Sequence, residues 1–182
     1  TAQRLEGSEI MRIMQAIRER FPDIREDAEI TIECNPGTAD VSKLVAYRSL
    51  GINRISFGLQ STDAEELKML GRIHSYEEFL QSYQWAREAG FSNINIDLMF
   101  AIPGQCYEGW IENLRMVAAL GPEHISAYSL IIEEGTPFAE QNLDLPDEDT
   151  EYQMYEDTAE ILSEYGYHIR RSKCTESVRT SQ

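Results

Sequence analysis

The chain alternates between helix-like segments and short apolar segments, and glycines mark most of the joints between them. Gly51, Gly90, Gly121 and Gly166 each follow a helix-like stretch. Glycine just past a helix end accepts the left-handed conformation that closes the helix. A short apolar or extended segment follows each of these glycines at once. This order is typical of the connections from helix to strand in a parallel sheet.

Four apolar segments have the length and composition of buried strands. They are residues 29–34, 54–60, 93–100 and 124–131. Strands that alternate with helices of ten to twenty residues predict an α/β fold with a parallel sheet. That sheet could be closed as a barrel or open and doubly wound.

Helices are predicted between these strands from apolar residues that recur with a helical period. Ser75 and Glu78 have the spacing of a capping box that opens a helix ending near Ala89. Further helices are expected to begin near Glu108 and Asp147. An earlier helix carries the clearest apolar stripe, made of Ile10, Ile13, Met14, Ile17 and Phe21.

Each of the first three predicted strands has one apolar face and one polar or small face, because side chains alternate along a strand. Glu33, Gln60 and Asp97 lie on the polar face, near the carboxyl ends of their strands. Ligands of parallel α/β folds bind at that end of the sheet. The three side chains therefore predict a shared site for a polar small molecule with hydroxyls and an amine. The alternative is an ordinary polar layer inside a barrel.

Two loops and one arginine add to this candidate site. Residues 34–38 and 101–105 follow the first and third strands, and each contains a Pro-Gly pair that favours a tight turn with exposed backbone groups. Arg72 comes after a short helix spanning residues 64–70. An arginine can grip a carboxylate in bidentate fashion, although a surface ion pair is the commoner role of a lone arginine.

Composition and charge narrow the class of protein. The 182 residues fit one domain, and 32 acidic against 16 basic residues give a formal net charge of −16. Such an acidic chain repels phosphate backbones, so we expect no nucleic-acid partner. No apolar run has the length of a membrane span, and no signal peptide is visible. The three cysteines imply no disulfide framework, so we expect a protein of the reducing cytoplasm. The chain begins with Thr1 and not with Met, so we expect an upstream segment.

The cysteines and histidines predict no metal site. Cys34, Cys106 and Cys174 are separated by 72 and 68 residues, which is not the spacing of a metal or disulfide framework. We interpret all three as structural. His124 and His168 are interpreted as packing or surface residues. His74, beside Arg72, is the histidine that merits a test as a ligand.

With these segments in place, the chain resembles a known family. It is similar to the radical S-adenosylmethionine proteins of the oxygen-independent coproporphyrinogen III oxidase type and their heme-chaperone relatives. Two stretches, residues 58–61 and 71–74, are closer to the heme-chaperone branch. The resemblance runs from about Glu9 to Tyr167, in order and with the family's spacing, and rests on the segments Glu33–Thr38, Arg54–Ser61, Leu70–His74, Asn95–Met99 with Pro103–Gln105, and His124–Leu130.

The resemblance implies a cofactor and roles for individual residues. Gln60 and Asp97 would hold the ribose of S-adenosylmethionine, and Arg72 its carboxylate. Glu33 would lie at the methionine end, and the region of Ala127 by the adenine. A [4Fe–4S] cluster would cleave the cofactor to a 5′-deoxyadenosyl radical that takes hydrogen from the substrate.

The chain also departs from the family. The Cys-x3-Cys-x2-Cys loop that binds the cluster is absent, and the three cysteines present cannot replace it. The implied fold is therefore a partial parallel (β/α) barrel of the radical S-adenosylmethionine type over residues 1–167, lacking its first strand and cluster loop. Ala101 stands where the family has glycine, and residues 168–182 form a divergent tail with no domain of its own.

Two functions follow from the resemblance, both for a longer parent protein that acts on a porphyrin or heme. The first is an oxidoreductase of porphyrin metabolism that uses S-adenosylmethionine and the cluster. The second is a chaperone that binds heme and delivers it to apoproteins without oxidase activity. Any other parallel α/β enzyme would require the five motifs to match by accident. Fold alone does not separate these functions.

Overall fold

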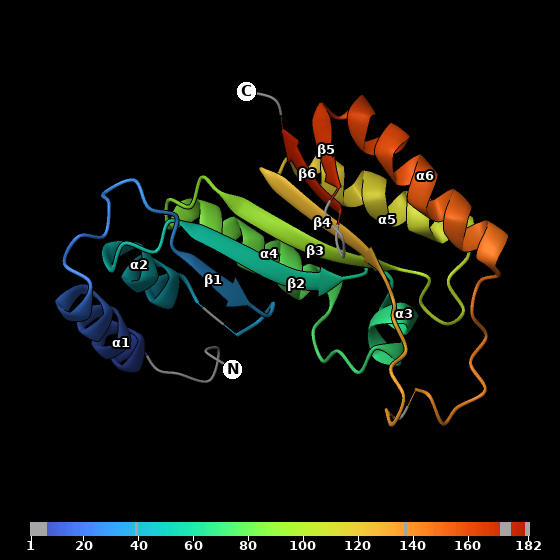
Figure 1. The fold of residues 1–182 in the computed structure, drawn as a ribbon, viewed down its shortest axis with the longest axis horizontal. Coiled ribbons are helices and arrows are strands. Elements are labelled where there is room, and N and C mark those ends of the chain that lie inside the picture. The colour runs from blue at the N-terminus through green and yellow to red at the C-terminus, as the bar shows by residue number, and fades with distance from the viewer. Residues whose placement is uncertain (1–6, 39, 137, 172–175, 181–182) are drawn as a thin grey trace.

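A single mixed sheet organises the protein (Figure 1). The computed structural model describes residues 7–38, 40–136, 138–171 and 176–180. In this part of the chain, six strands form one sheet in the order β1-β2-β3-β4-β6-β5. Its first four strands pair in parallel, which confirms the predicted parallel α/β fold: β1 (Thr31–Cys34), β2 (Arg54–Gln60), β3 (Ile94–Phe100) and β4 (His124–Ser129).

Helices fill the connections between the strands, as the helical periodicity predicts. Gly51, Gly90, Gly121 and Gly166 all have positive φ, between 65° and 89°. The predicted capping box is confirmed, because Ser75 and Glu78 exchange side-chain to backbone hydrogen bonds. The helices are α1 (Gly7–Arg20), α2 (Val41–Ser49), α3 (Ala64–Met69), α4 (Tyr76–Glu88), α5 (Tyr107–Ala119) and α6 (Glu148–Glu164).

The core lies between the apolar face of the sheet and the helices α4 and α5, which lie behind the strands in Figure 1. Phe57, Ile96 and Leu98 project from this face and are fully buried, and Trp110 of α5 packs there as well. Burial of each such side chain contributes roughly 1.5 to 3 kcal/mol. Trp110 also ties α5 to α6, since its Nε1 donates to Thr158 Oγ1 at 2.9 Å.

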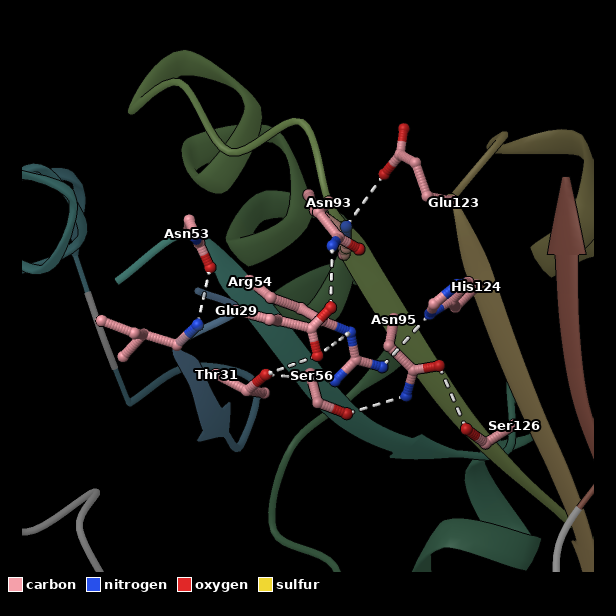
Figure 2. A network of polar contacts seen from close by, with 12 residues as sticks. Glu29, Thr31, Asn53, Arg54, Ser56, Asn93, Asn95, Glu123, His124 and Ser126 are labelled. Atoms are coloured by element: carbon pink, nitrogen blue, oxygen red, sulfur yellow. Dashed lines mark hydrogen bonds and ion pairs between the residues drawn. The ribbon is translucent and has the colours of Figure 1, made fainter. Parts of the chain in front are cut away.

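The opposite face of the sheet is polar and carries no helix in the described part of the chain. Near the amino ends of the strands, Arg54 lies between Glu29 and His124 (Figure 2). Its guanidinium lies 3.9 Å from a Glu29 carboxylate oxygen and 3.3 Å from His124 Nδ1. Asn53 joins the same end to β1, because its Oδ1 accepts from the Ile30 amide at 2.8 Å. These contacts fix the strand starts and leave the carboxyl ends of the strands for a ligand.

The edges of the sheet agree with the predicted partial barrel. The sheet is an open arc, with β1 at one edge and β5 at the other, so the barrel is not closed, as expected for one that lacks its first strand. The tail adds β6 (Glu176–Thr180), which was not predicted, after β5 (Tyr167–Arg171), whose start follows Gly166 as the helix-to-strand pattern predicts. Strand β6 pairs antiparallel with β4 and with β5, so β5 runs in the same direction as the first four strands.

The apolar stripe of the first helix is only half used for packing. Ile10 and Met14 of α1 are buried, whereas Ile13 and Phe21 are 46% and 61% exposed. The helical period is predicted correctly, but the stripe is wider than the surface that α1 covers in the described structure.

Candidate functional site

A cavity of about 330 Å³ lies where the carboxyl ends of the parallel strands meet the polar face of the sheet. Its volume is at the lower end of the range of small-molecule sites. Four of the five residues predicted to bind a cofactor line it: Glu33, Gln60, Arg72 and Asp97. The cavity is completed by Cys34, Asn35, Ser56, Gly58 and Tyr128.

Asp97 is the charged side chain of this cavity that hydrogen bonds hold in place. It lies on β3, and its two carboxylate oxygens accept hydrogen bonds from Asn95 Nδ2 at 2.8 Å and from Ser56 Oγ at 3.1 Å. Burial raises the pKa of Asp97, and the two hydrogen bonds act against that rise because they favour the charged form. The remaining lone pairs of the carboxylate are available to a hydroxyl group in the cavity.

Gln60 ends β2 in an unusual backbone conformation. Its φ is 75°, in the left-handed region that residues other than glycine rarely adopt, and the register between β2 and β3 shifts just before it. Its side chain is 4% exposed, and its Oε1 accepts a hydrogen bond from the Tyr128 hydroxyl at 2.7 Å. That bond leaves the Nε2 of Gln60 as the donor for a ligand. The strained conformation is a typical feature of a binding site.

Glu33 and Arg72 bring opposite charges to the same cavity. Glu33 lies on the exposed face of β1, and Arg72 follows α3, which lies at the carboxyl end of β2 (Figure 1). In the described part of the chain, neither side chain has a hydrogen bond or an ion pair. The alternative of a surface ion pair for Arg72 therefore has no partner in the described structure. An ammonium group and a carboxylate on one ligand would satisfy both charges.

Ala127 is the predicted site residue that the structure does not place in the cavity. It lies on β4 with its side chain buried in the core, on the face opposite to Ser126 and Tyr128. Tyr128, the next residue along β4, lines the cavity in its place, because side chains alternate between the two faces of the strand.

A larger cavity of about 560 Å³ lies between α3 and α5 and is lined by acidic residues, among them Asp63, Glu65 and Glu112. We assign no ligand to it. The Glu66 carboxylate there is already held by Gln105 and Asn113, at 2.9 and 3.1 Å, and by the Ser61 hydroxyl. This arrangement serves to join α3 to α5.

Among the described residues, no cluster of three or more histidine, cysteine or acidic side chains is placed to hold a metal ion. Cys34 is buried in β1 and Cys106 is exposed at the start of α5, while Cys174 lies outside the described residues. His74 is buried, and its Nε2 donates to the Leu59 carbonyl at 3.2 Å, which accounts for it as a packing residue. No helix in the described part is long and apolar enough to cross a membrane.

Comparison with known proteins identifies relatives of this chain. The radical SAM superfamily profile matches residues 4–117. The heme chaperone HemW of Escherichia coli is 39% identical over 163 residues, which are 90% of this chain and 43% of that protein. HemW of Haemophilus influenzae is 39% identical over 145 residues, or 80% of this chain and 38% of that protein.

A solved structure matches almost the whole chain. Coproporphyrinogen III oxidase (HemN) from Escherichia coli superimposes with a TM-score of 0.85 and 29% identity. The match covers 97% of this chain and 40% of the oxidase chain. The present chain thus spans about two fifths of the length of the relatives that it matches.

Proposed function

The chain belongs to the radical SAM superfamily, and from this premise we propose that the cavity formed by Glu33, Gln60, Arg72 and Asp97 binds S-adenosylmethionine. The observation that carries the proposal is the pair of opposite charges, Glu33 and Arg72, that line one cavity without partners of their own in the described structure. S-adenosylmethionine has a zwitterionic amino-acid end and a ribose, so it presents both the charges and the hydroxyls that these side chains require.

Each side chain has one role in this proposal. The planar guanidinium of Arg72 would hold the carboxylate of the ligand, and Glu33 would accept from its ammonium group. Asp97 would accept from a ribose hydroxyl, and Gln60 Nε2 would donate to a hydroxyl oxygen. When bound beside a reduced [4Fe–4S] cluster, S-adenosylmethionine supplies a 5′-deoxyadenosyl radical. The described cysteines do not fit that cluster, so its ligands lie outside the described residues.

For the whole protein that contains this chain, we propose a heme chaperone. The relatives named as heme chaperones are 39% identical to the chain, whereas the coproporphyrinogen oxidase is 29% identical. The oxidase function, placed first by the sequence resemblance, is the second candidate, and the high structural similarity to that enzyme favours it. In both functions the protein acts on a porphyrin or on heme.

Calorimetric titration of the full-length protein with S-adenosylmethionine tests the cofactor site. We expect Asp97→Ala to weaken binding by about 1 to 3 kcal/mol, because the hydrogen-bond donors that pair with the Asp97 carboxylate would be left without an acceptor. Arg72→Lys should also weaken binding, since a point charge cannot reproduce the planar fork. Asp149→Ala and Arg115→Lys, at exposed positions on helices, are the matched controls. Unchanged affinity in both site variants, together with normal thermal melts, would show that the cofactor assignment is wrong.

Two assays separate the chaperone from the oxidase. The first is anaerobic turnover of coproporphyrinogen III with S-adenosylmethionine and a reductant, and the second is binding of heme followed by its transfer to an apoprotein. A chaperone binds and transfers heme without decarboxylating coproporphyrinogen III. Decarboxylation without heme transfer would establish the oxidase instead.

A further inference from the structure

Three polar residues, Ser56, Asn95 and Ser126, form a hydrogen-bonded layer (Figure 2), and Ser56 and Asn95 also donate to Asp97. These residues come from three neighbouring strands, β2, β3 and β4, and share the polar face of the sheet. Ser56 and Asn95 are only 7% and 2% exposed. Burial of an amide is costly unless its hydrogen bonds are made. The hydrogen-bond partners of the polar atoms in this layer therefore show which group the layer supports.

The hydrogen bonds in this layer run in one direction, towards Asp97. Ser126 Oγ donates to Asn95 Oδ1 at 3.0 Å, which fixes the orientation of the amide. The Asn95 Nδ2 then donates to Asp97 Oδ1 and to Ser56 Oγ, both at 2.8 Å. Because Ser56 Oγ accepts this bond, its own proton is directed to Asp97 Oδ2 at 3.1 Å.

We propose that Asn95 is a positioning residue, which keeps Asp97 ionised and turns the free lone pairs of its carboxylate towards the cavity. In the described part of the chain, the Asn95 side chain donates to Asp97 and to Ser56 and accepts from Ser126, and none of its hydrogen bonds goes to the backbone. The amide therefore connects Asp97 to the serines of the two neighbouring strands and supplies the donor to Asp97 Oδ1. This inference deepens the proposed binding of S-adenosylmethionine and rests on it for the identity of the ligand.

The charges around Asp97 show why such support is needed. Glu33 faces it from β1, and its negative charge adds to burial in raising the pKa of Asp97. Tyr128 from β4 and Arg72 from the segment after α3 line the same cavity. Hydrogen bonds from Asn95 and Ser56 lower the pKa of the carboxyl. Removal of Asn95 would therefore leave Asp97 protonated at a higher pH, and a protonated carboxyl offers fewer acceptor sites to a ligand.

Titration of Asp97 by carbon NMR in the full-length protein, with labelled aspartate carboxyls and Asp97→Asn to assign the signal, tests this role. Asn95→Leu should shift the midpoint of Asp97 to higher pH, and Ser56→Ala should shift it in the same direction by less. Affinity for S-adenosylmethionine should fall about tenfold in Asn95→Leu at a pH between the two midpoints, and recover as pH rises.

Asn113→Leu is the matched control. Asn113 is also a buried asparagine that donates to a carboxylate, that of Glu66, in the cavity between α3 and α5. This variant should lose stability without any change in the Asp97 midpoint. An unchanged midpoint in folded Asn95→Leu would overturn the proposal, and if that variant does not fold, an unchanged midpoint in Ser56→Ala overturns it. Should the wild type bind no S-adenosylmethionine, the proposed function fails while the NMR titration still decides the role of Asn95.

Discussion

Gln60 and Gly58 together set the shape of the cavity floor at the end of β2. A Cβ at position 58 would lie 3.1 Å from Gln60 Nε2 and 3.4 Å from Asn35 Oδ1. Both distances are tight, and the atoms involved belong to the polar ends of side chains. Since Tyr128 fixes the other end of the Gln60 amide, a new methyl group would displace the donor that faces the cavity.

We therefore expect Gly58→Ala to reduce affinity for S-adenosylmethionine about tenfold while the fold is retained. The side chain of Gln60 can move at a small cost in stability, but its donor would no longer lie in the cavity. Calorimetric titration beside a thermal melt measures both effects. Gly109→Ala on α5, where a Cβ would lie at 3.6 Å or more from its neighbours, is the control. Equal affinity of Gly58→Ala and wild type would contradict the assigned role of Gln60.

The raised pKa of Asp97 leads to a prediction of how the stability of the fold depends on pH. Burial raises the pKa of this carboxyl in the folded state, so the folded protein holds a proton in a pH range where the unfolded chain has lost it. Stability from this group is therefore present in acid and is lost as pH rises from about 4, the ordinary value, through the raised pKa. Asp97→Asn removes the titration, so we expect its melting temperature to fall less than that of wild type as pH rises from about 4 to 7. Melting temperatures across this range measure the effect, and an equal or larger fall in the variant would refute it.

The sequence predicts much of the site at this scale, for a physical reason. Alternation along the strands places Glu33 and Asp97 on the polar face, because β1 and β3 are regular in their pairing there. The backbone of Gln60 does not follow the alternation, since a register shift and a positive φ orient it. The support of Asp97 by the layer of Ser56, Asn95 and Ser126 was not predicted, because such a role depends on which amide atom faces which partner.

At the scale of the element, the start of α4 is closed by a reciprocal pair of hydrogen bonds. Ser75 Oγ accepts from the Glu78 amide at 3.2 Å, and a Glu78 carboxylate oxygen accepts from the Ser75 amide at 2.8 Å. Backbone N–H groups in the first turn of a helix have no partner within the helix, so these bonds stabilise it. The spacing of Ser75 and Glu78 is sufficient to predict this contact, because it depends on local geometry alone.

We expect Ser75→Ala to lower the free energy of unfolding by about 1 kcal/mol, the usual cost of a lost N-cap. Ser75→Asp should restore most of the loss, because a carboxylate oxygen can accept the same bond. Ser163→Ala is the control, since that hydroxyl donates to the Glu160 carbonyl near the end of α6 and caps no free amide. The measurement is the thermal melt of each variant. A loss in Ser163→Ala as large as in Ser75→Ala would mean that the cap has no special role.

Whole-molecule features were predictable to different degrees. The four βα units follow from repeated local signals, namely the glycine after each helix and the apolar run after each glycine. Closure of the sheet depends on contacts between segments far apart in the chain, so local patterns left a barrel and an open sheet as alternatives. The antiparallel pairing of β6 with β4 and β5 could not be predicted either, because the tail carries no turn signal or alternation that specifies a partner strand.

The positions of the cysteines in the whole molecule lead to a prediction about binding of an iron–sulfur cluster. Radical SAM proteins use a [4Fe–4S] cluster held by three thiolates. Cys34 is buried in β1, and burial raises the pKa of its thiol, which keeps it protonated and a poor ligand. Cys106 is exposed at the start of α5, and Cys174 lies outside the described residues. After anaerobic reconstitution, we expect the 182-residue chain to hold no stoichiometric iron or sulfide and the full-length protein, reconstituted in parallel, to hold both. A cluster on the chain itself would mean that the three cysteines converge, and the assignment of all of them as structural residues would then be wrong.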